Sequence, residues 1–162
     1  MNPLFQSMEL SREVIDVLSA KGISSFTTVQ AESFEPVFHG QDVICRSRTG
    51  TGKTLAFGLP SITRLSKLGA GRVNVATGER APRGRLPSMV VLCPTRELAK
   101  QVADEIELVS KPLGLDVLSI YGGVSYDPQA RQLRNGVDIV VGTPGRTIDH
   151  IEKGNLDLAG KF

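Results

Sequence analysis

The stretch Asp42–Phe57 (DVICRSRTGTGKTLAF) constrains the fold more strongly than any other part of the chain. Its apolar run Val43–Cys45 predicts a buried strand, which leads into a loop that contains two glycines. Glycine allows backbone conformations in which several N–H groups face one anion, and the helix predicted from Lys53 adds the positive end of its dipole. We therefore interpret residues 47–54 as a loop that binds the phosphates of a nucleoside triphosphate.

The residues of this loop have separate roles in the chemistry that the pattern indicates. Lys53 is expected to reach the β- and γ-phosphates, and the hydroxyl of Thr54 is expected to hold Mg²⁺. The strict pattern has glycine at the first position, where this chain has Ser47. The alternative is a plain glycine-rich turn between a strand and a helix. The predicted phosphate site comprises Ser47, Arg48, Thr49, Gly50, Thr51, Gly52, Lys53 and Thr54.

Composition indicates a single globular domain. The chain has 162 residues, of which 40% are hydrophobic and 22% charged, with a net charge of +2. That length is sufficient for one core, and the weak positive charge permits a polyanionic partner without requiring one. No apolar run approaches the roughly 18 residues of a membrane span, and the N-terminus lacks the pattern of a signal peptide. We expect an intracellular, soluble protein without a membrane partner. The two cysteines, Cys45 and Cys93, are expected in buried strands as small core residues.

Helical and strand patterns alternate along the chain. A helix is expected from Ser11 to Ala20, and Thr27-Thr-Val-Gln30 matches a capping box at the start of a second. Further strands are expected at 89–93, 116–121 and 137–141, with helices beginning after Thr95, Asp127 and Thr143. Nearly all strand residues are apolar, which is typical of a parallel sheet. The predicted fold is therefore α/β, with helices on both faces of a parallel sheet.

The segment 69–87 interrupts this alternation. It carries glycine and proline throughout, with four arginines against one glutamate. We predict a surface loop, either a solvated insertion or an auxiliary contact with nucleic acid.

Three expected strands end in features suited to anions. The phosphate loop follows the first, Pro94-Thr95-Arg96 follows the second, and Thr143-Pro144-Gly145-Arg146 follows the last. In a parallel sheet these ends share one edge, and each helix start offers free N–H groups there. Gly122-Gly123 adds a flexible turn at the same edge. Ordinary helix capping is the alternative for each feature, but several along one edge indicate an extended polyanion bound through its backbone.

Four segments resemble, in order, motifs I, Ia, GG and Ib of DEAD-box RNA helicases. They are SRTGTGKT (47–54), PTRELA (94–99), Gly122-Gly123 and TPGR (143–146). The resemblance covers nearly the whole chain and is greatest to nucleolar Gu-type and plastid members. It implies a P-loop, RecA-like core at 42–162 preceded by a Q-motif region at 1–41. It also implies ATP and Mg²⁺ as cofactors, RNA as partner, and a nucleolar, nuclear or plastid location.

The resemblance assigns roles residue by residue. Gln30 matches the glutamine that reads the adenine edge, and Phe5 matches the upstream aromatic that stacks on adenine. Lys53 and Thr54 are the catalytic candidates, and Thr54 is the metal ligand. The residues that match RNA-backbone contacts are Pro94, Thr95, Arg96, Gly122, Gly123, Thr143, Pro144, Gly145 and Arg146. His39 and His150 match nothing catalytic and are expected at the surface.

Two departures from the family pattern shape the expected activity. The region before Gln30 lacks the family's usual prolines, and the chain reaches Phe162 without the Asp-Glu-Ala-Asp segment or the second RecA-like domain. Asp104-Glu105 lies within a predicted helix and Asp138 precedes its apolar run, so neither replaces that segment. We expect nucleotide binding with little hydrolysis by this chain alone, together with an unpaired sheet edge and exposed apolar surface.

Three functions remain open from sequence. The first is the ATP- and RNA-binding domain of a helicase that separates short RNA duplexes. The second is a non-catalytic module that binds nucleotide or RNA. The third, a small-molecule P-loop kinase, leaves 94–99 and 143–146 without a role.

Overall fold

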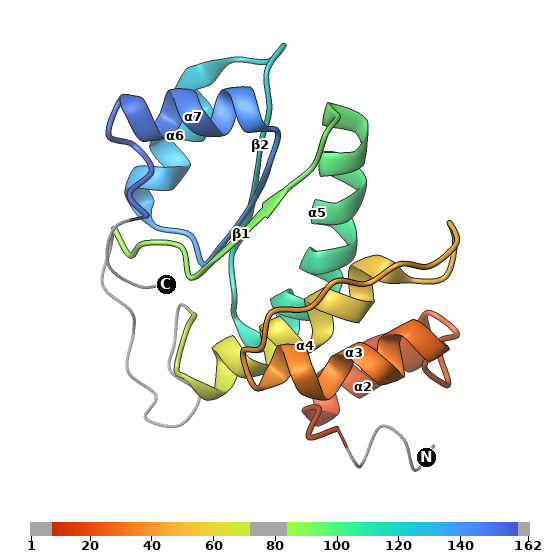
Figure 1. Cartoon of the computed structure of the whole chain (residues 1–162). Helices are drawn as coiled ribbons and strands as arrows, with labels where there is room; N and C mark the ends of the chain where they lie inside the picture. Colours follow the sequence, from red (N-terminus) through yellow and green to blue (C-terminus); the bar gives the residue numbers. More distant parts are fainter. Residues whose placement is uncertain (1–7, 72–83, 159–162) are drawn as a thin grey trace.

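A parallel sheet forms the centre of the computed structural model, which describes residues 8–71 and 84–158 (Figure 1). Within the described residues its strands are β1 (Met89–Leu92), β2 (Val117–Ile120) and β3 (Ile139–Gly142), in the order β1-β3-β2. β3 is the middle strand, and its register aligns Ile139 with Met89 on one side and with Val117 on the other. The predicted parallel sheet is therefore confirmed.

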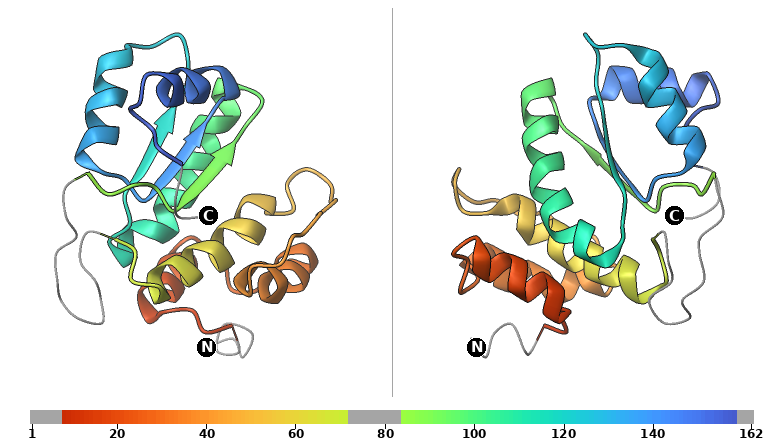
Figure 2. Two further views of the ribbon diagram at one scale, coloured as in Figure 1. Left: turned by 60° about the vertical axis from the view of Figure 1, so that its left-hand side comes forward. Right: turned by 180° about the vertical axis from the view of Figure 1, so that it is seen from behind.

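Helices cover both faces of this sheet. The helices are α2 (Arg12–Ala20), α3 (Thr28–Phe38), α4 (Lys53–Lys67), α5 (Arg96–Ser110), α6 (Tyr126–Asn135) and α7 (Pro144–Glu152), with a 3₁₀ turn at Lys111–Leu113. α5 lies on one face, while α6 and α7 lie on the other (Figures 1 and 2). α2, α3 and α4 form a further layer against α5.

Side chains of β3 alternate between two apolar cores, as strand geometry requires. Ile139 and Val141 pack into the core shared with α2 to α5, and Val140 packs into the smaller core with residues of α6. All three side chains are fully buried. β3 is thus anchored on both faces and fixes the position of the chain that follows it.

Hydroxyl side chains begin two of the helices as the sequence predicts. Thr95 accepts a hydrogen bond from the backbone N–H of Leu98 at 3.2 Å, and Ser11 accepts one from Val14 at 3.4 Å. Thr143 is the N-cap of α7, with Pro144 at the first helical position. α6 begins two residues earlier than expected, with Ser125 rather than Asp127 as its N-cap residue.

The strand expected before the phosphate loop is absent from the described structure. Residues 41–48 form neither helix nor strand, Cys45 is exposed, and Ile44 is fully exposed. The prediction of a buried strand at Val43–Cys45 was therefore wrong. An apolar run becomes a strand only where a neighbour accepts its backbone hydrogen bonds, and among the described residues β1 pairs with β3 alone. Cys93, in contrast, is buried as expected. Among the described residues, β1 therefore has one unpaired edge, and the apolar side chains of Ile44 and Leu92 are exposed, as the sequence predicts.

The C-terminal end of the predicted 69–87 loop is fixed in place by a half-buried arginine. Residues 72–83 of this prediction lie outside the described residues, but the side chain of Arg85 is only 14% exposed. Its guanidinium donates to Asp138 at 2.8 and 3.0 Å and to Asp116 at 2.5 Å. These carboxylates raise the pKa of Arg85, chiefly through the hydrogen bonds from Asp138. For Arg85, the expectation of a solvated or nucleic-acid-binding arginine was wrong.

Replacement of this arginine should destabilise the domain. In Arg85→Met the buried Asp138 carboxylate loses its counterion, and we expect the free energy of unfolding to fall by about 3 kcal/mol in urea denaturation. Arg131→Met, on the exposed side of α6, is the control and should change it by less than about 0.5 kcal/mol. Equal effects of the two substitutions would show that the Arg85 ion pairs contribute nothing specific.

Candidate phosphate and nucleic-acid binding site

The phosphate loop is held closed by its own side chains. Gly50 and Gly52 adopt φ values of 78°, which β-carbons disfavour, as the sequence predicts. The ammonium of Lys53 donates to the carbonyls of Ser47 at 2.8 Å and Arg48 at 2.9 Å. The hydroxyls of Ser47 and Thr51 lie 2.7 Å apart. Lys53 must therefore exchange these carbonyls for phosphate oxygens when an anion enters the loop.

The start of α3 braces the same loop. The Gln30 side chain is buried; its nitrogen donates to the Gly52 carbonyl at 3.1 Å, and its oxygen accepts from the Thr27 N–H at 3.0 Å. The Thr27 hydroxyl donates to the carbonyl of Thr51 at 2.9 Å. A β-carbon at Gly52 would collide with the Gln30 amide. Gln30 therefore forms its part of the predicted capping box and also supports the phosphate loop.

A cleft of about 430 Å³ connects the phosphate loop to the end of β1. Its lining includes Lys53 and Thr54 at the start of α4, and Cys93 and Pro94 after β1. Much of the remaining lining is apolar, including Val43, Phe57, Val91, Leu92 and Leu98. The cleft brings the first two sequence motifs together, as their strand-to-helix positions predict.

The cleft offers one protein oxygen suited to Mg²⁺. The Thr54 hydroxyl is a hard oxygen ligand that lies next to Lys53 in the cleft lining. Mg²⁺ at phosphate sites takes one or two protein oxygens and completes its shell with water and phosphate. Within residues 8–71 and 84–158, no group of three or more His, Cys, Asp or Glu side chains forms a metal site. Thr54 thus fits a metal that arrives with a nucleotide.

A second set of residues lies along the carboxyl ends of the three strands. Pro94, Thr95 and Arg96 follow β1, Gly122 and Gly123 follow β2, and Thr143 to Arg146 follow β3. We call these segments the rim. The exposed members are Pro94, Thr95, Arg96, Gly122, Gly123, Pro144 and Gly145. The structure therefore brings together the three motifs that sequence assigned to a polyanion.

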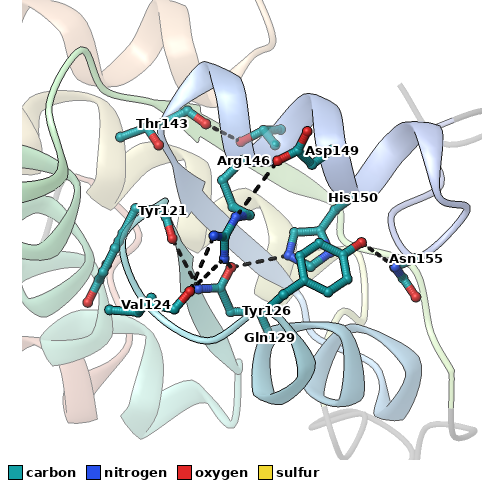
Figure 3. A network of polar contacts seen from close by, with 10 residues as sticks. Tyr121, Val124, Tyr126, Gln129, Thr143, Arg146, Asp149, His150 and Asn155 are labelled. Atoms are coloured by element: carbon teal, nitrogen blue, oxygen red, sulfur yellow. Dashed lines mark hydrogen bonds and ion pairs between the residues drawn. The ribbon is translucent and has the colours of Figure 1, made fainter.

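Arg96 and Arg146 occupy different environments on this rim. The Arg96 side chain is 51% exposed and lies beside Gly123, where an added β-carbon would be 2.6 Å from its guanidinium. The Arg146 side chain is 13% exposed, and its guanidinium donates to the Val124 carbonyl and to Gln129 (Figure 3). Among the described residues, Arg96 is exposed and makes only a 3.8 Å ion pair with the exposed Glu97, whereas Arg146 is hydrogen-bonded within the protein.

His150 belongs to the same network, and the expectation that it lies at the surface was wrong. Its ring is fully buried, stacks on Tyr126 at 4.3 Å between centroids, and bonds Gln129 through Nε2 at 3.1 Å (Figure 3). Its Nδ1 is buried without a hydrogen-bond partner. Burial lowers the pKa of His150, and the positive charge of Arg146 lowers it further. The other histidine, His39, is exposed as expected.

Sequence reasoning missed two residues that support these sites. Thr27 was recognised as a helix cap but not as a brace for Thr51, and Gln129 was not singled out. A glutamine near the start of a predicted helix carries no distinctive sequence signal. Phe5, the predicted adenine-stacking residue, lies outside the described residues. No helix in the described ranges has the length and apolar character needed to cross a membrane.

Sequence comparisons place these motifs among known proteins. A profile described as "DEAD/DEAH box helicase" matches residues 27–160. The mouse "ATP-dependent RNA helicase DDX50" is 42% identical over 155 residues, which are 96% of this chain and 20% of that protein. The maize "DEAD-box ATP-dependent RNA helicase 3B, chloroplastic" is 46% identical over 149 residues, 92% of this chain and 19% of that protein. The chain thus spans about a fifth of the length of these curated relatives.

Solved structures of DEAD-box proteins have the same fold as this chain. The RNA helicase Prp28 from Chaetomium thermophilum bound to ADP superposes with a TM-score of 0.78 at 34% identity, covering 94% of this chain and 35% of that one. A DEAD box protein from Methanococcus jannaschii superposes with a TM-score of 0.75, also at 34% identity, covering 95% of this chain and 38% of that one. The predicted RecA-like α/β fold is confirmed.

The buried His150 should make stability depend on pH. Because its folded pKa lies below the ordinary value of 6.5, the unfolded chain binds a proton that the folded chain resists. Stability is therefore retained above pH 6.5 and lost as the pH falls below it. We expect the melting temperature to fall between pH 7.5 and pH 5, and His150→Phe to reduce that fall.

His39→Asn is the matched control, since the chain has two histidines. A wild-type pH profile that persists in His150→Phe would contradict this assignment.

Proposed function

The chain belongs to the DEAD/DEAH box helicase family, and from that membership we propose that it is the ATP- and RNA-binding first domain of an ATP-dependent RNA helicase. The observation that carries the proposal is the cleft that joins Lys53 and Thr54 to Pro94, the first residue of the rim. A nucleotide site and a polyanion site thus adjoin at one edge of the sheet. The names of the mouse and maize relatives support the same class of activity.

The phosphate loop supplies the nucleotide site in this proposal. The Lys53 ammonium leaves the carbonyls of Ser47 and Arg48 and binds the β- and γ-phosphates, and the loop N–H groups surround the phosphate oxygens. Thr54 holds Mg²⁺, which neutralises phosphate charge when bound. Gln30 keeps the loop in place through Gly52 and reads the adenine edge, while Phe5 stacks on the base.

The rim supplies the RNA site. Exposed backbone at Gly122, Gly123 and Gly145 offers N–H groups to phosphates, and Arg96 offers an exposed positive charge. These groups contact the sugar-phosphate backbone rather than base edges, so binding is independent of sequence and sensitive to salt. We propose that duplex separation requires a second RecA-like domain that closes over both ligands. The names of the rat "Nucleolar RNA helicase 2", which is 42% identical over 154 residues, and of the chloroplastic maize relative favour a nucleolar or plastid location.

Loss of the loop lysine should abolish tight nucleotide binding. A charge-assisted contact to phosphate contributes about 1.5–3 kcal/mol, so Lys53→Ala should weaken ATP–Mg²⁺ binding roughly 10- to 100-fold in isothermal titration calorimetry. Lys111→Ala removes an exposed lysine after α5 and should bind as wild type. Wild-type protein that binds no ATP would refute the nucleotide site.

The rim arginine should contribute one ionic contact to RNA. For single-stranded oligouridylate, log Kd against log salt has a slope of about 0.7 per neutralised phosphate. We expect Arg96→Gln to weaken binding and to reduce this slope by about 0.7, measured by fluorescence anisotropy. Arg131→Gln on α6 is the control for the loss of an exposed arginine. An unchanged slope in Arg96→Gln would place the RNA elsewhere.

A further inference from the structure

The guanidinium of Arg146 binds the protein through one part and keeps another part for an outside anion. Nη1 donates to the Val124 carbonyl and to Gln129 Oε1, both at 3.2 Å, and Nη2 donates to the same carbonyl at 3.2 Å (Figure 3). The N–H of Nε and the second N–H of Nη2 make no hydrogen bond to a described residue. These two groups lie along one edge of the guanidinium, and such an edge can bind a phosphate with two parallel hydrogen bonds.

Gln129 supports this arginine from inside the protein, and its own side chain is fixed. It is buried on α6, and its amide nitrogen donates to the Tyr121 carbonyl at 3.2 Å. Because the nitrogen is bonded to that carbonyl, the oxygen is the atom that faces Arg146. The same oxygen lies 3.1 Å from His150 Nε2, which therefore carries a proton and donates it. The His150 ring stacks on Tyr126 with 4.3 Å between centroids, so the acceptor oxygen has one position.

We propose that Gln129 is a positioning residue for RNA binding, which holds Nη1 of Arg146 so that the Nε and Nη2 edge meets an RNA phosphate. The inner bonds and the phosphate contact use different N–H groups and can exist together. An arginine that is already oriented loses less side-chain freedom when the phosphate binds. The Asp149 carboxylate, 3.9 Å from Nε and largely exposed, is the charge that the phosphate replaces. This inference rests on the proposed RNA site and adds to it a residue that touches no RNA.

Replacement of this uncharged, buried side chain tests the assignment. Leucine has a similar size but lacks the oxygen, so in Gln129→Leu the arginine loses its inner partner. We expect oligouridylate affinity to fall about tenfold, and the slope of log Kd against log salt to fall by about 0.7, the share of one phosphate. Gln132→Leu, exposed on the same helix, is the matched control and should bind as wild type. Wild-type affinity and slope in Gln129→Leu would overturn the inference.

A double-mutant cycle shows whether Gln129 acts through Arg146. Arg146→Gln alone should lower the affinity and the slope by similar amounts, because it removes the contact that Gln129 supports. Adding Gln129→Leu to Arg146→Gln should then change neither quantity further. Additive losses, or a lower affinity of Gln129→Leu at the wild-type slope, would show general loosening of the fold and refute the positioning role.

Side-chain NMR signals of the wild-type protein test the same point if Gln129→Leu does not fold. Oligouridylate should shift the Nε–H signal of Arg146 and leave the side-chain amide signals of Gln129 nearly in place, because the inner bonds persist. The exposed Gln132 amide gives the reference for a glutamine on the surface. Gln129 signals that move to that reference when RNA binds would contradict the proposal.

These measurements also separate this inference from the proposed function. If wild-type protein binds no oligouridylate, the proposed RNA site itself is wrong. If wild-type protein binds and Arg146→Gln lowers the slope while Gln129→Leu leaves it unchanged, the RNA site stands and the positioning role of Gln129 is wrong.

Discussion

Parallel pairing of β3 with both of its neighbours determines where the functional groups lie. The pairing directs the chain ends after β1, β2 and β3 toward one edge, where backbone N–H groups at the helix starts point outward. The end of β3 is tightly packed, because a β-carbon at Gly142 would lie 2.6 Å from atoms of both Ile120 and Thr147. Only glycine lets α7 begin this close to β2. The separation between the Gly122 turn and the start of α7 is therefore set by backbone packing, and Arg146 forms a hydrogen bond across it to the Val124 carbonyl.

The phosphate loop obtains its support from a helix rather than from the sheet. Within the described residues no strand pairs with the segment before the loop, and two hydrogen bonds from Thr27 and Gln30 hold its carbonyls instead. Each such bond contributes about 1 kcal/mol net, so this support is modest. Lys53 closes the loop on its own carbonyls, which a phosphate must displace. A phosphate that enters the loop therefore replaces partners that Lys53 already has.

Local sequence signals predicted much of this fold, and the errors occurred where distant partners decide the outcome. Thr95 caps its helix by accepting from the N–H of Leu98, and Thr143-Pro144 begins α7 at the expected positions, so these local patterns were sufficient. Val43–Cys45 has strand character, but a ladder partner cannot be read from the run itself. The two carboxylates that bind Arg85 lie 31 and 53 residues away in the sequence. Gln129, which bonds to His150, is separated from it by 21 residues. Burial of such polar groups follows from tertiary contacts that composition does not reveal.

The central claim is that one edge of the sheet carries two separate anion sites. Amide chemical-shift mapping of ¹⁵N-labelled protein, first with ATP–Mg²⁺ and then with oligouridylate, tests it most directly. We predict that ATP–Mg²⁺ shifts amides of residues 27–30 and 47–54, and that RNA shifts amides of 95–97, 122–124 and 145–146. Two largely distinct sets would support the account. RNA that perturbs the phosphate loop and leaves the rim unchanged would contradict it.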